Sequence, residues 1–187
     1  AAMIDIGAES TGESADLVVA FNEQVLYGRI ANAAFRPGTV VLLESKWAED
    51  AQEEIRKQYA TAVAEFRAQG LEVIELPMEA ACLEVMPDAR VGKNMFVVGM
   101  LSWIYQRDMA KVLGEVAVVF RKKGEKVVES NCALVQAGYE FARTEVGLCF
   151  EVPPWQPGTK MVVMNGNQAV GLGVMASGME LVAMYPI

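Results

Sequence analysis

The stretch GTVVLLES, Gly38–Ser45, is a short apolar run that follows a turn signal, RPG. Such a run is typical of a strand buried on both faces. Two similar runs, DLVVAFN at Asp16–Asn22 and LEVIELP at Leu71–Pro77, predict a strand before it and a strand after it. The segments between the runs predict helices, so the order β-α-β-α-β indicates a parallel sheet with crossover helices.

Both connecting segments carry helix signals. EQVLYGRIANAAF starts after Asn22, a residue type that caps helices well. In AEDAQEEIRKQYATAVAEFRAQG one apolar stripe recurs at helical spacing, and Gly70 follows as the C′ residue that ends the helix. The stripe consists of Ile55, Tyr59, Ala62, Val63 and Phe66.

From Met78 to Val146 the pattern predicts helices only. NMFVVGMLSWIYQ is apolar all round, which indicates a buried helix, and EKVVESNCALVQAGYEFARTEV predicts a long one. The helix expected between them has a broad apolar stripe: Met109, Val112, Leu113, Val116, Val119 and Phe120. EVPPWQPGT at Glu151–Thr159 predicts a Pro-rich linker, residues 151–160, between a domain 1–150 and a closing β-α-β at 161–187.

Composition excludes several kinds of function. The net charge of -8 and the pI of about 4.7 argue against nucleic acid and anionic membrane surfaces as partners. The chain has no histidine, which removes histidine-based catalysis and histidine metal ligands. Cys82, Cys132 and Cys149 form no CxxC pair, and they favour reduced thiols in a cytoplasmic protein. We therefore predict no catalytic residue and no metal site in the chain.

Glycines in the closing segment raise the question of a phosphate loop. Gly166, Gly171, Gly173 and Gly178 have the spacing G-x4-G-x-G-x4-G, but Leu172 stands where a Walker loop has its lysine. We expect close helix–sheet packing instead, with nucleotide binding as an alternative. Asn165 or Asn167 is expected to cap the helix.

Two segments bring basic residues to the ends of predicted helices. RVGKNMF at Arg90–Phe96 brings two cations to a helix N-terminus, where a solvated helix start is favoured over an anion site. FRKKGEK at Phe120–Lys126 is interpreted as a helix end that complements the helix dipole, because Gly124 stops the helix there.

The closing run NGNQAVGLGVMASGMELVAMYPI resembles the opening of the α subunit of the 2-oxoacid:ferredoxin (acceptor) oxidoreductases. That family has G-N-x-A-x-A-x-G-x-x-A-G-x-x-x-x-x-x-Y-P-I before a Thr-Pro, and this chain has glycine at 171 and serine at 177 where alanine is commoner. The matching positions are Asn167, Ala169, Gly173, Gly178, Tyr185, Pro186 and Ile187.

The preceding part resembles the γ subunit of the same enzymes. DLVVAFNEQVLYGRI, RVGKNMFVVGMLSWI and VFRKKGEKVVESNCALVQAGYEFA follow in order, the last with K-K-G-x-x-V-x-x-x-N and a downstream A-G-Y. A γ domain ahead of an α domain is similar to the α subunit of 2-oxoglutarate:acceptor oxidoreductases. The resemblance implies a three-layer α/β/α sandwich with a mostly parallel sheet, and then the first β-α-β of a thiamine-enzyme α domain.

The resemblance also implies the chemistry of the complete enzyme. It would decarboxylate a 2-oxoacid, 2-oxoglutarate before pyruvate, on thiamine diphosphate with Mg, pass electrons through an iron–sulfur cluster to ferredoxin, and deliver the acyl group to coenzyme A. The thiamine site would lie between the α and β subunits, so the partners are the β subunit and the rest of α. Tyr185, Pro186 and Ile187 are the candidate leads into that site.

The chain departs from the family pattern at two places. It starts after the βα unit with a glycine-rich turn that opens the family's γ region, and it stops at Ile187, before the threonine expected to contact the substrate carboxylate. We therefore expect a fragment or partly recorded subunit that is structural and inactive alone. The alternative is a free-standing α/β scaffold module of an electron-transfer complex.

Overall fold

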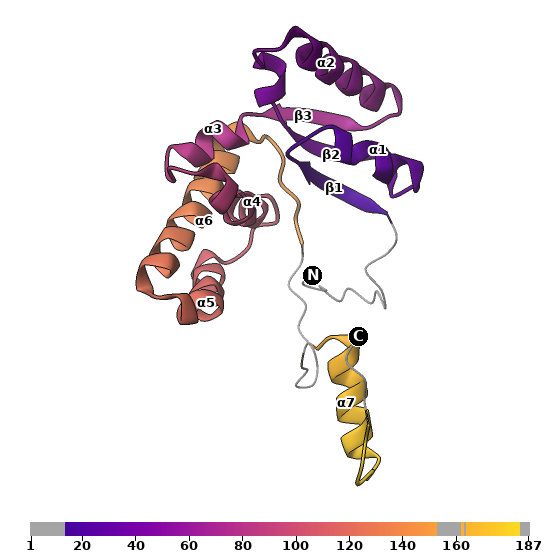
Figure 1. The fold of residues 1–187 in the computed structure, drawn as a ribbon, viewed down its shortest axis with the longest axis vertical. Coiled ribbons are helices and arrows are strands. Elements are labelled where there is room, and N and C mark those ends of the chain that lie inside the picture. The colour runs from indigo at the N-terminus through magenta and orange to yellow at the C-terminus, as the bar shows by residue number, and fades with distance from the viewer. Residues whose placement is uncertain (1–13, 153–161, 163, 184–187) are drawn as a thin grey trace. The chain divides into compact units, whose positions relative to one another are not determined.

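The computed structural model describes residues 14–152, 162 and 164–183 of the chain (Figure 1). These residues fall into two units, one up to residue 152 and one from residue 162, and each is described by itself.

A three-stranded parallel sheet forms the centre of the first unit. It consists of β1 (Ala15–Ala20), β2 (Phe35–Glu44) and β3 (Glu72–Leu76), in the order β1-β2-β3. Val41 on the middle strand pairs with Val18 and with Val73. The three strands and their parallel direction confirm the sheet that the apolar runs predict.

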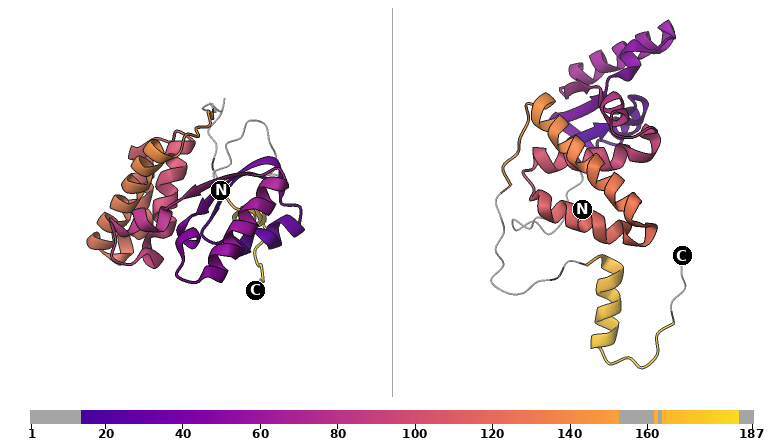
Figure 2. Two further views of the ribbon diagram at one scale, coloured as in Figure 1. Left: turned by 90° about the horizontal axis from the view of Figure 1, so that it is seen from above. Right: turned by 90° about the vertical axis from the view of Figure 1, so that its left-hand side faces the viewer.

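Helices cover both faces of this sheet, so the unit has three layers, as the resemblance implies (Figure 2). Side chains alternate along β2: Val41 and Leu43 join the core beneath α1 and α2, whereas Val40 and Leu42 join the core beneath α3, α4 and α6. The bounds are α1 (Gln24–Ala31), η1 (Lys46–Glu49), α2 (Glu53–Ala68), α3 (Met78–Leu83), α4 (Ala89–Ile104), α5 (Met109–Phe120), η2 (Arg121–Lys123) and α6 (Glu125–Glu145).

The predicted end of α2 is confirmed, but the predicted cap of α1 is displaced by one residue: Glu23 is the N-cap, its side chain makes no capping hydrogen bond, and Asn22 precedes it. The Asn22 side chain accepts a hydrogen bond from the Gln24 backbone N–H at 2.6 Å, and Gly70 follows α2 with φ of 84°. The RPG segment differs from the prediction, because β2 runs through it and the pairing with β1 is irregular there. Gly38, with φ of 85°, supplies the backbone conformation that this bulge requires.

Two glycines set the contact between α4 and α6. A Cβ atom on Gly99 would collide with the Val135 carbonyl oxygen, and one on Gly138 would collide with the Phe96 carbonyl oxygen. The backbones therefore touch at this crossing. Around it Phe96, Met100 and Ile104 are buried, which confirms the predicted burial of α4.

α5 differs from its predicted stripe at one position. Val116 is buried in the contact with α6, but Val119 is 68% exposed. α5 ends at Phe120, and Gly124, with φ of 99°, separates it and η2 from α6.

The second unit contains α7 (Gly166–Ala176), which confirms the predicted helix. The Asn165 side chain accepts from the Gln168 N–H, and the Gln168 side chain accepts from the Asn165 N–H, so a complete capping box starts it. The strand expected after α7 is not formed over Leu181–Ala183, because a strand needs a neighbour to pair with and these residues have no ladder partner among the described ones. Most of the strand expected before α7 lies outside the described residues.

Within the described part of the chain, no helix combines the length and apolar character that crossing a bilayer requires.

Candidate functional site

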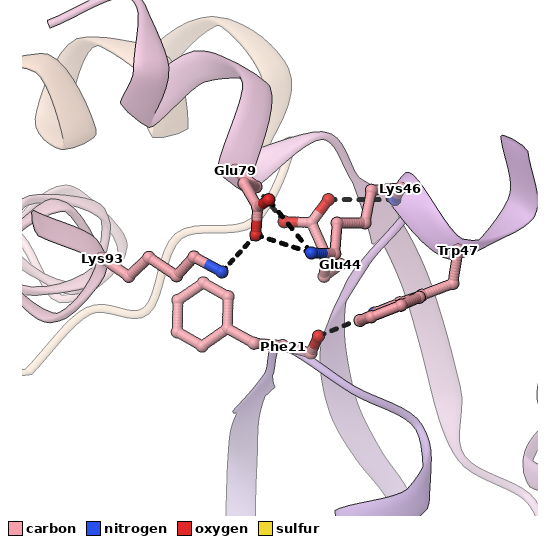
Figure 3. A network of polar contacts seen from close by, with 6 residues as sticks. All are labelled: Phe21, Glu44, Lys46, Trp47, Glu79 and Lys93. Atoms are coloured by element: carbon pink, nitrogen blue, oxygen red, sulfur yellow. Dashed lines mark hydrogen bonds and ion pairs between the residues drawn. The ribbon is translucent and has the colours of Figure 1, made fainter. Parts of the chain in front are cut away.

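A network of charged side chains lies where the parallel strands end. Glu44 is the last residue of β2, Lys46 lies in η1 directly after it, and Glu79 lies in the first turn of α3 after β3 (Figure 3). Lys93 reaches the same place from α4. In α/β folds this carboxyl edge of the sheet is the usual place for a ligand.

Glu44 fixes the two chain segments that leave the sheet here. Its side chain is fully buried, and its two carboxylate oxygens accept the Lys46 N–H at 3.0 Å and the Glu79 N–H at 2.7 Å. Burial raises the pKa of Glu44, and the two backbone donors oppose that rise. The residue therefore holds η1 and the start of α3 in fixed positions.

Glu79 forms ion pairs with both lysines of the network. The Lys46 ammonium lies 3.0 and 2.9 Å from its two oxygens, and the Lys93 ammonium forms a second ion pair with it. Burial alone would raise the pKa of Glu79, but the hydrogen bonds and charges of Lys93 and Lys46 outweigh it, so the pKa is lowered. Glu79 is thus held as a carboxylate.

Aromatic rings line the same network. The Lys46 ammonium lies 4.2 Å from the centre of the Trp47 ring, and the Lys93 ammonium lies 5.1 Å from that of Phe21. The Trp47 indole N–H donates to the Phe21 carbonyl oxygen at 2.9 Å, which ties η1 to the end of β1. All three strand ends are therefore joined through one set of side chains.

The network has a structural role, and we call its four charged residues the brace: Glu44, Lys46, Glu79 and Lys93. The Glu79 carboxylate pairs with both lysine ammonium groups, and the Glu44 carboxylate accepts two backbone N–H groups, so each carboxylate has its partners within the network. The nearby Cys82 thiol is buried, and burial raises its pKa, which keeps it protonated and unreactive. No set of three or more His, Cys, Asp or Glu side chains within the described ranges could hold a metal ion.

The predicted site residues fall in three places. Tyr185, Pro186 and Ile187 lie outside the described residues, so their role stays a prediction. Gly166, Gly171 and Gly173 lie in α7, and Gly178 follows the helix with φ of 76°. An added Cβ on any of them would meet nothing within 4 Å, so the close helix–sheet packing expected of these glycines is not found among the described residues.

Lys93, which the sequence placed at a solvated helix start, lies in the brace with its side chain only 19% exposed. That expectation was wrong for Lys93, because Glu79 and Phe21 cover it. Sequence reasoning also missed Glu44, Lys46 and Glu79. The one available signal was a glutamate at the end of an otherwise apolar strand, since a charge at such a position is buried only when it is paired.

Comparison with known proteins gives a family match over residues 3–141, to the family described as pyruvate ferredoxin/flavodoxin oxidoreductase.

Individual relatives agree with that match. The chain is 31% identical over 94 residues to the 2-oxoglutarate oxidoreductase subunit KorA of Mycobacterium tuberculosis. This alignment covers 49% of this chain and 14% of that protein. It is 29% identical over 104 residues to the 2-oxoacid:ferredoxin oxidoreductase 2 subunit alpha of Aeropyrum pernix, covering 54% of this chain and 16% of the relative.

A solved structure has a similar fold. It is the 2-oxoglutarate:ferredoxin oxidoreductase from Magnetococcus marinus with 2-oxoglutarate, coenzyme A and succinyl-CoA bound, at 25% identity and a TM-score of 0.65. The match covers 91% of this chain and 27% of that one, so the chain spans less than a third of each relative.

Proposed function

Because the chain belongs to the pyruvate ferredoxin/flavodoxin oxidoreductase family, we propose that it is part of a 2-oxoacid:ferredoxin or related acceptor oxidoreductase. The family match over residues 3–141 is the observation that carries this proposal. The two similar subunits are both named as parts of 2-oxoglutarate or 2-oxoacid oxidoreductases and support it.

The proposed substrate is 2-oxoglutarate, ahead of pyruvate. Both the Mycobacterium tuberculosis subunit and the Magnetococcus marinus enzyme are named for 2-oxoglutarate, and the latter holds succinyl-CoA as well. The proposed overall reaction is oxidative decarboxylation with coenzyme A as the acyl acceptor and ferredoxin as the electron acceptor. Thiamine diphosphate, when bound with Mg in the complete enzyme, supplies the stabilisation that decarboxylation of a 2-oxoacid needs.

The proposed role of this segment is structural. Its polar brace joins the ends of the sheet, and the groups within the brace are paired with one another rather than free to act on a substrate. We propose that this segment holds none of the cofactors, and that thiamine diphosphate, Mg, an iron–sulfur cluster and coenzyme A are bound elsewhere in the complete enzyme, by the β subunit and the rest of the α subunit. The three free cysteines fit a cytoplasmic location.

The test compares the chain alone with the chain produced together with the remaining subunits of its enzyme. Each sample receives 2-oxoglutarate or pyruvate with coenzyme A, thiamine diphosphate and Mg, and reduction of methyl viologen is followed. We expect no reduction by the chain alone. The complete enzyme should reduce the dye in a reaction that depends on coenzyme A, with kcat/KM at least about tenfold higher for 2-oxoglutarate.

Each result bears on a separate part of the proposal. Dye reduction by the chain alone would overturn the structural role. A complete enzyme that prefers pyruvate would overturn the substrate, and one that acts on neither acid would overturn the proposed activity.

A further inference from the structure

α5 is an apolar helix that is little buried. Its sequence, MAKVLGEVAVVF, contains two charged residues, and Val116 is the residue buried in it. The helix packs against α6 and lies away from the sheet, at the far end of the helical layer (Figure 1). Much of its apolar surface is therefore left open to a partner.

That surface includes a groove between α5 and α6. The groove has a volume of about 390 Å³ and is lined by Ala117, Val118, Arg121, Glu125 and Val128. Val118 is 63% exposed in its wall. On the same side of α5, at helical spacing from Ala117, stand Ala110 and Gly114, both exposed, and a Cβ atom on Gly114 would meet nothing within 4 Å. A second helix could therefore lie close against this side.

The end of the groove is positively charged. Arg121 lines it, Lys122 and Lys123 are exposed in η2, and Lys126 is exposed in the first turn of α6. Glu125 and Glu129 at the start of α6 are the nearby acidic residues, so the four cations leave positive charge in excess here although the whole chain carries -8. A partner that fills the apolar groove and carries carboxylates at this end would match both properties.

We propose that the groove between α5 and α6 docks an acidic amphipathic helix of a partner protein. The described helices of the chain itself do not have both features. α2 carries acidic residues in its first turn, but its apolar stripe is buried against the sheet. α7 is apolar and has no charged residue. This inference goes beyond the proposed function and does not depend on the substrate.

The test is a binding titration of the full chain with a synthetic amphipathic peptide helix that has leucines on one face and glutamates on the other. Fluorescence anisotropy gives the Kd at low and at high salt. A peptide with lysine in place of glutamate and one with serine in place of leucine are the probe controls. We expect the glutamate peptide to bind at least about tenfold more tightly than either control, and less tightly as salt is raised.

Two pairs of variants locate the binding. Val118→Ser should weaken it about tenfold, whereas Val119→Ser, a neighbouring valine of similar exposure that does not line the groove, should leave it unchanged. Arg121→Glu should weaken it by a similar factor, and Lys57→Glu on the exposed side of α2 is the matched charge control. Circular dichroism checks that each variant is folded.

Other outcomes contradict the proposal. Equal binding of the acidic and basic peptides, or an equal loss in Val119→Ser, would remove the groove as the site. Binding to phosphatidylcholine–phosphatidylserine vesicles without binding to the peptide would make it a membrane-facing surface. Self-association that Val118→Ser abolishes would make it an interface between copies of this chain.

Discussion

Gly138 shows how one missing side chain permits a backbone contact. Its α-carbon lies so close to Phe96 that an added Cβ would collide with the Phe96 carbonyl oxygen, and a backbone group cannot turn aside as a side chain can. Gly138→Ala should therefore lower the free energy of unfolding by about 3 kcal/mol, the upper end of the range for overpacking. Urea denaturation followed by circular dichroism measures it.

Gly114 is the matched control at the same scale. It also lies inside a helix, but nothing is within 4 Å of its would-be Cβ. Gly114→Ala should raise the free energy of unfolding by about 0.5–1 kcal/mol, because alanine loses less conformational freedom in a helix. A gain in stability from Gly138→Ala equal to that from Gly114→Ala would mean that helix propensity, not the crossing, decides the effect of the substitution.

Single residues also show what sequence reasoning can and cannot predict. Gly70 ends α2 through its own backbone conformation, so local pattern predicts its role, and the same kind of pattern places the cap of α1 within one residue, at Asn22 instead of Glu23. Gly99 and Gly138 act across two helices that are separate in sequence, and only the packed structure brings them together. The A-G-Y motif contains Gly138 but gives no indication of its contact.

At the scale of elements, the brace of Glu44, Lys46, Glu79 and Lys93 joins η1, α3 and α4 to the sheet. Glu79→Gln removes the carboxylate that both lysines share and leaves the largely covered Lys93 without its ion pair. We expect a loss of about 2 kcal/mol in unfolding free energy at neutral pH, between the values typical of surface and buried pairs.

The effect of Glu79→Gln should depend on pH. Because the folded state lowers the pKa of Glu79, its contribution is present above the ordinary value of 4.5 and is lost as the pH falls through the lowered value. Glu44, whose pKa is raised, titrates in both proteins. Urea denaturation at neutral pH and well below 4.5 should show that the wild-type advantage disappears in acid.

Glu53→Gln is the control for that experiment. Glu53 pairs with Lys57 on the surface of α2, where both side chains are well exposed, and its loss should change stability by less than about 0.5 kcal/mol. A loss from Glu79→Gln that is no larger than this, or that persists in acid, would contradict the role of the brace.

The order of elements could be predicted, because apolar runs and helical stripes are local patterns. The strands at β1 and β3 lie close to the predicted runs. The brace could not be predicted, since its members come from four segments that meet only after the sheet forms. The prediction of a turn at RPG was wrong, because a strand can continue through a turn-like sequence by forming a bulge there.

At the scale of the whole molecule, the second unit leaves apolar side chains uncovered. The exposed large apolar residues in and after α7 are Val170, Leu172, Met175, Met179, Leu181 and Val182. We expect the isolated chain to self-associate reversibly. The double substitution Val170→Ser with Met175→Ser should weaken this association and raise its Kd at least about tenfold. Sedimentation velocity over a concentration series measures it.

The matched control is a pair of equivalent changes in the first unit, Val25→Ser with Val91→Ser, whose side chains are 60% and 71% exposed. These should leave the association unchanged. A chain that stays monomeric at all concentrations would contradict the expectation.

Family and fold class at this scale could be predicted from motifs, since several of them occur in the family's order along the chain. The candidate leads Tyr185, Pro186 and Ile187 could not be placed, because they lie outside the described residues and their proposed contacts belong to other parts of the enzyme.

The crossing of α4 and α6 has a consequence for alignment. Each helix offers a glycine where the other offers a carbonyl oxygen: Gly99 faces Val135, and Gly138 faces Phe96. Sliding α4 by one turn would bring Met95 or Trp103 to the position of Gly99, and neither side chain fits against a backbone. The two glycines therefore fix the axial register of α4 against α6: the helices fit in one alignment, and a shift of one turn in either direction produces a clash.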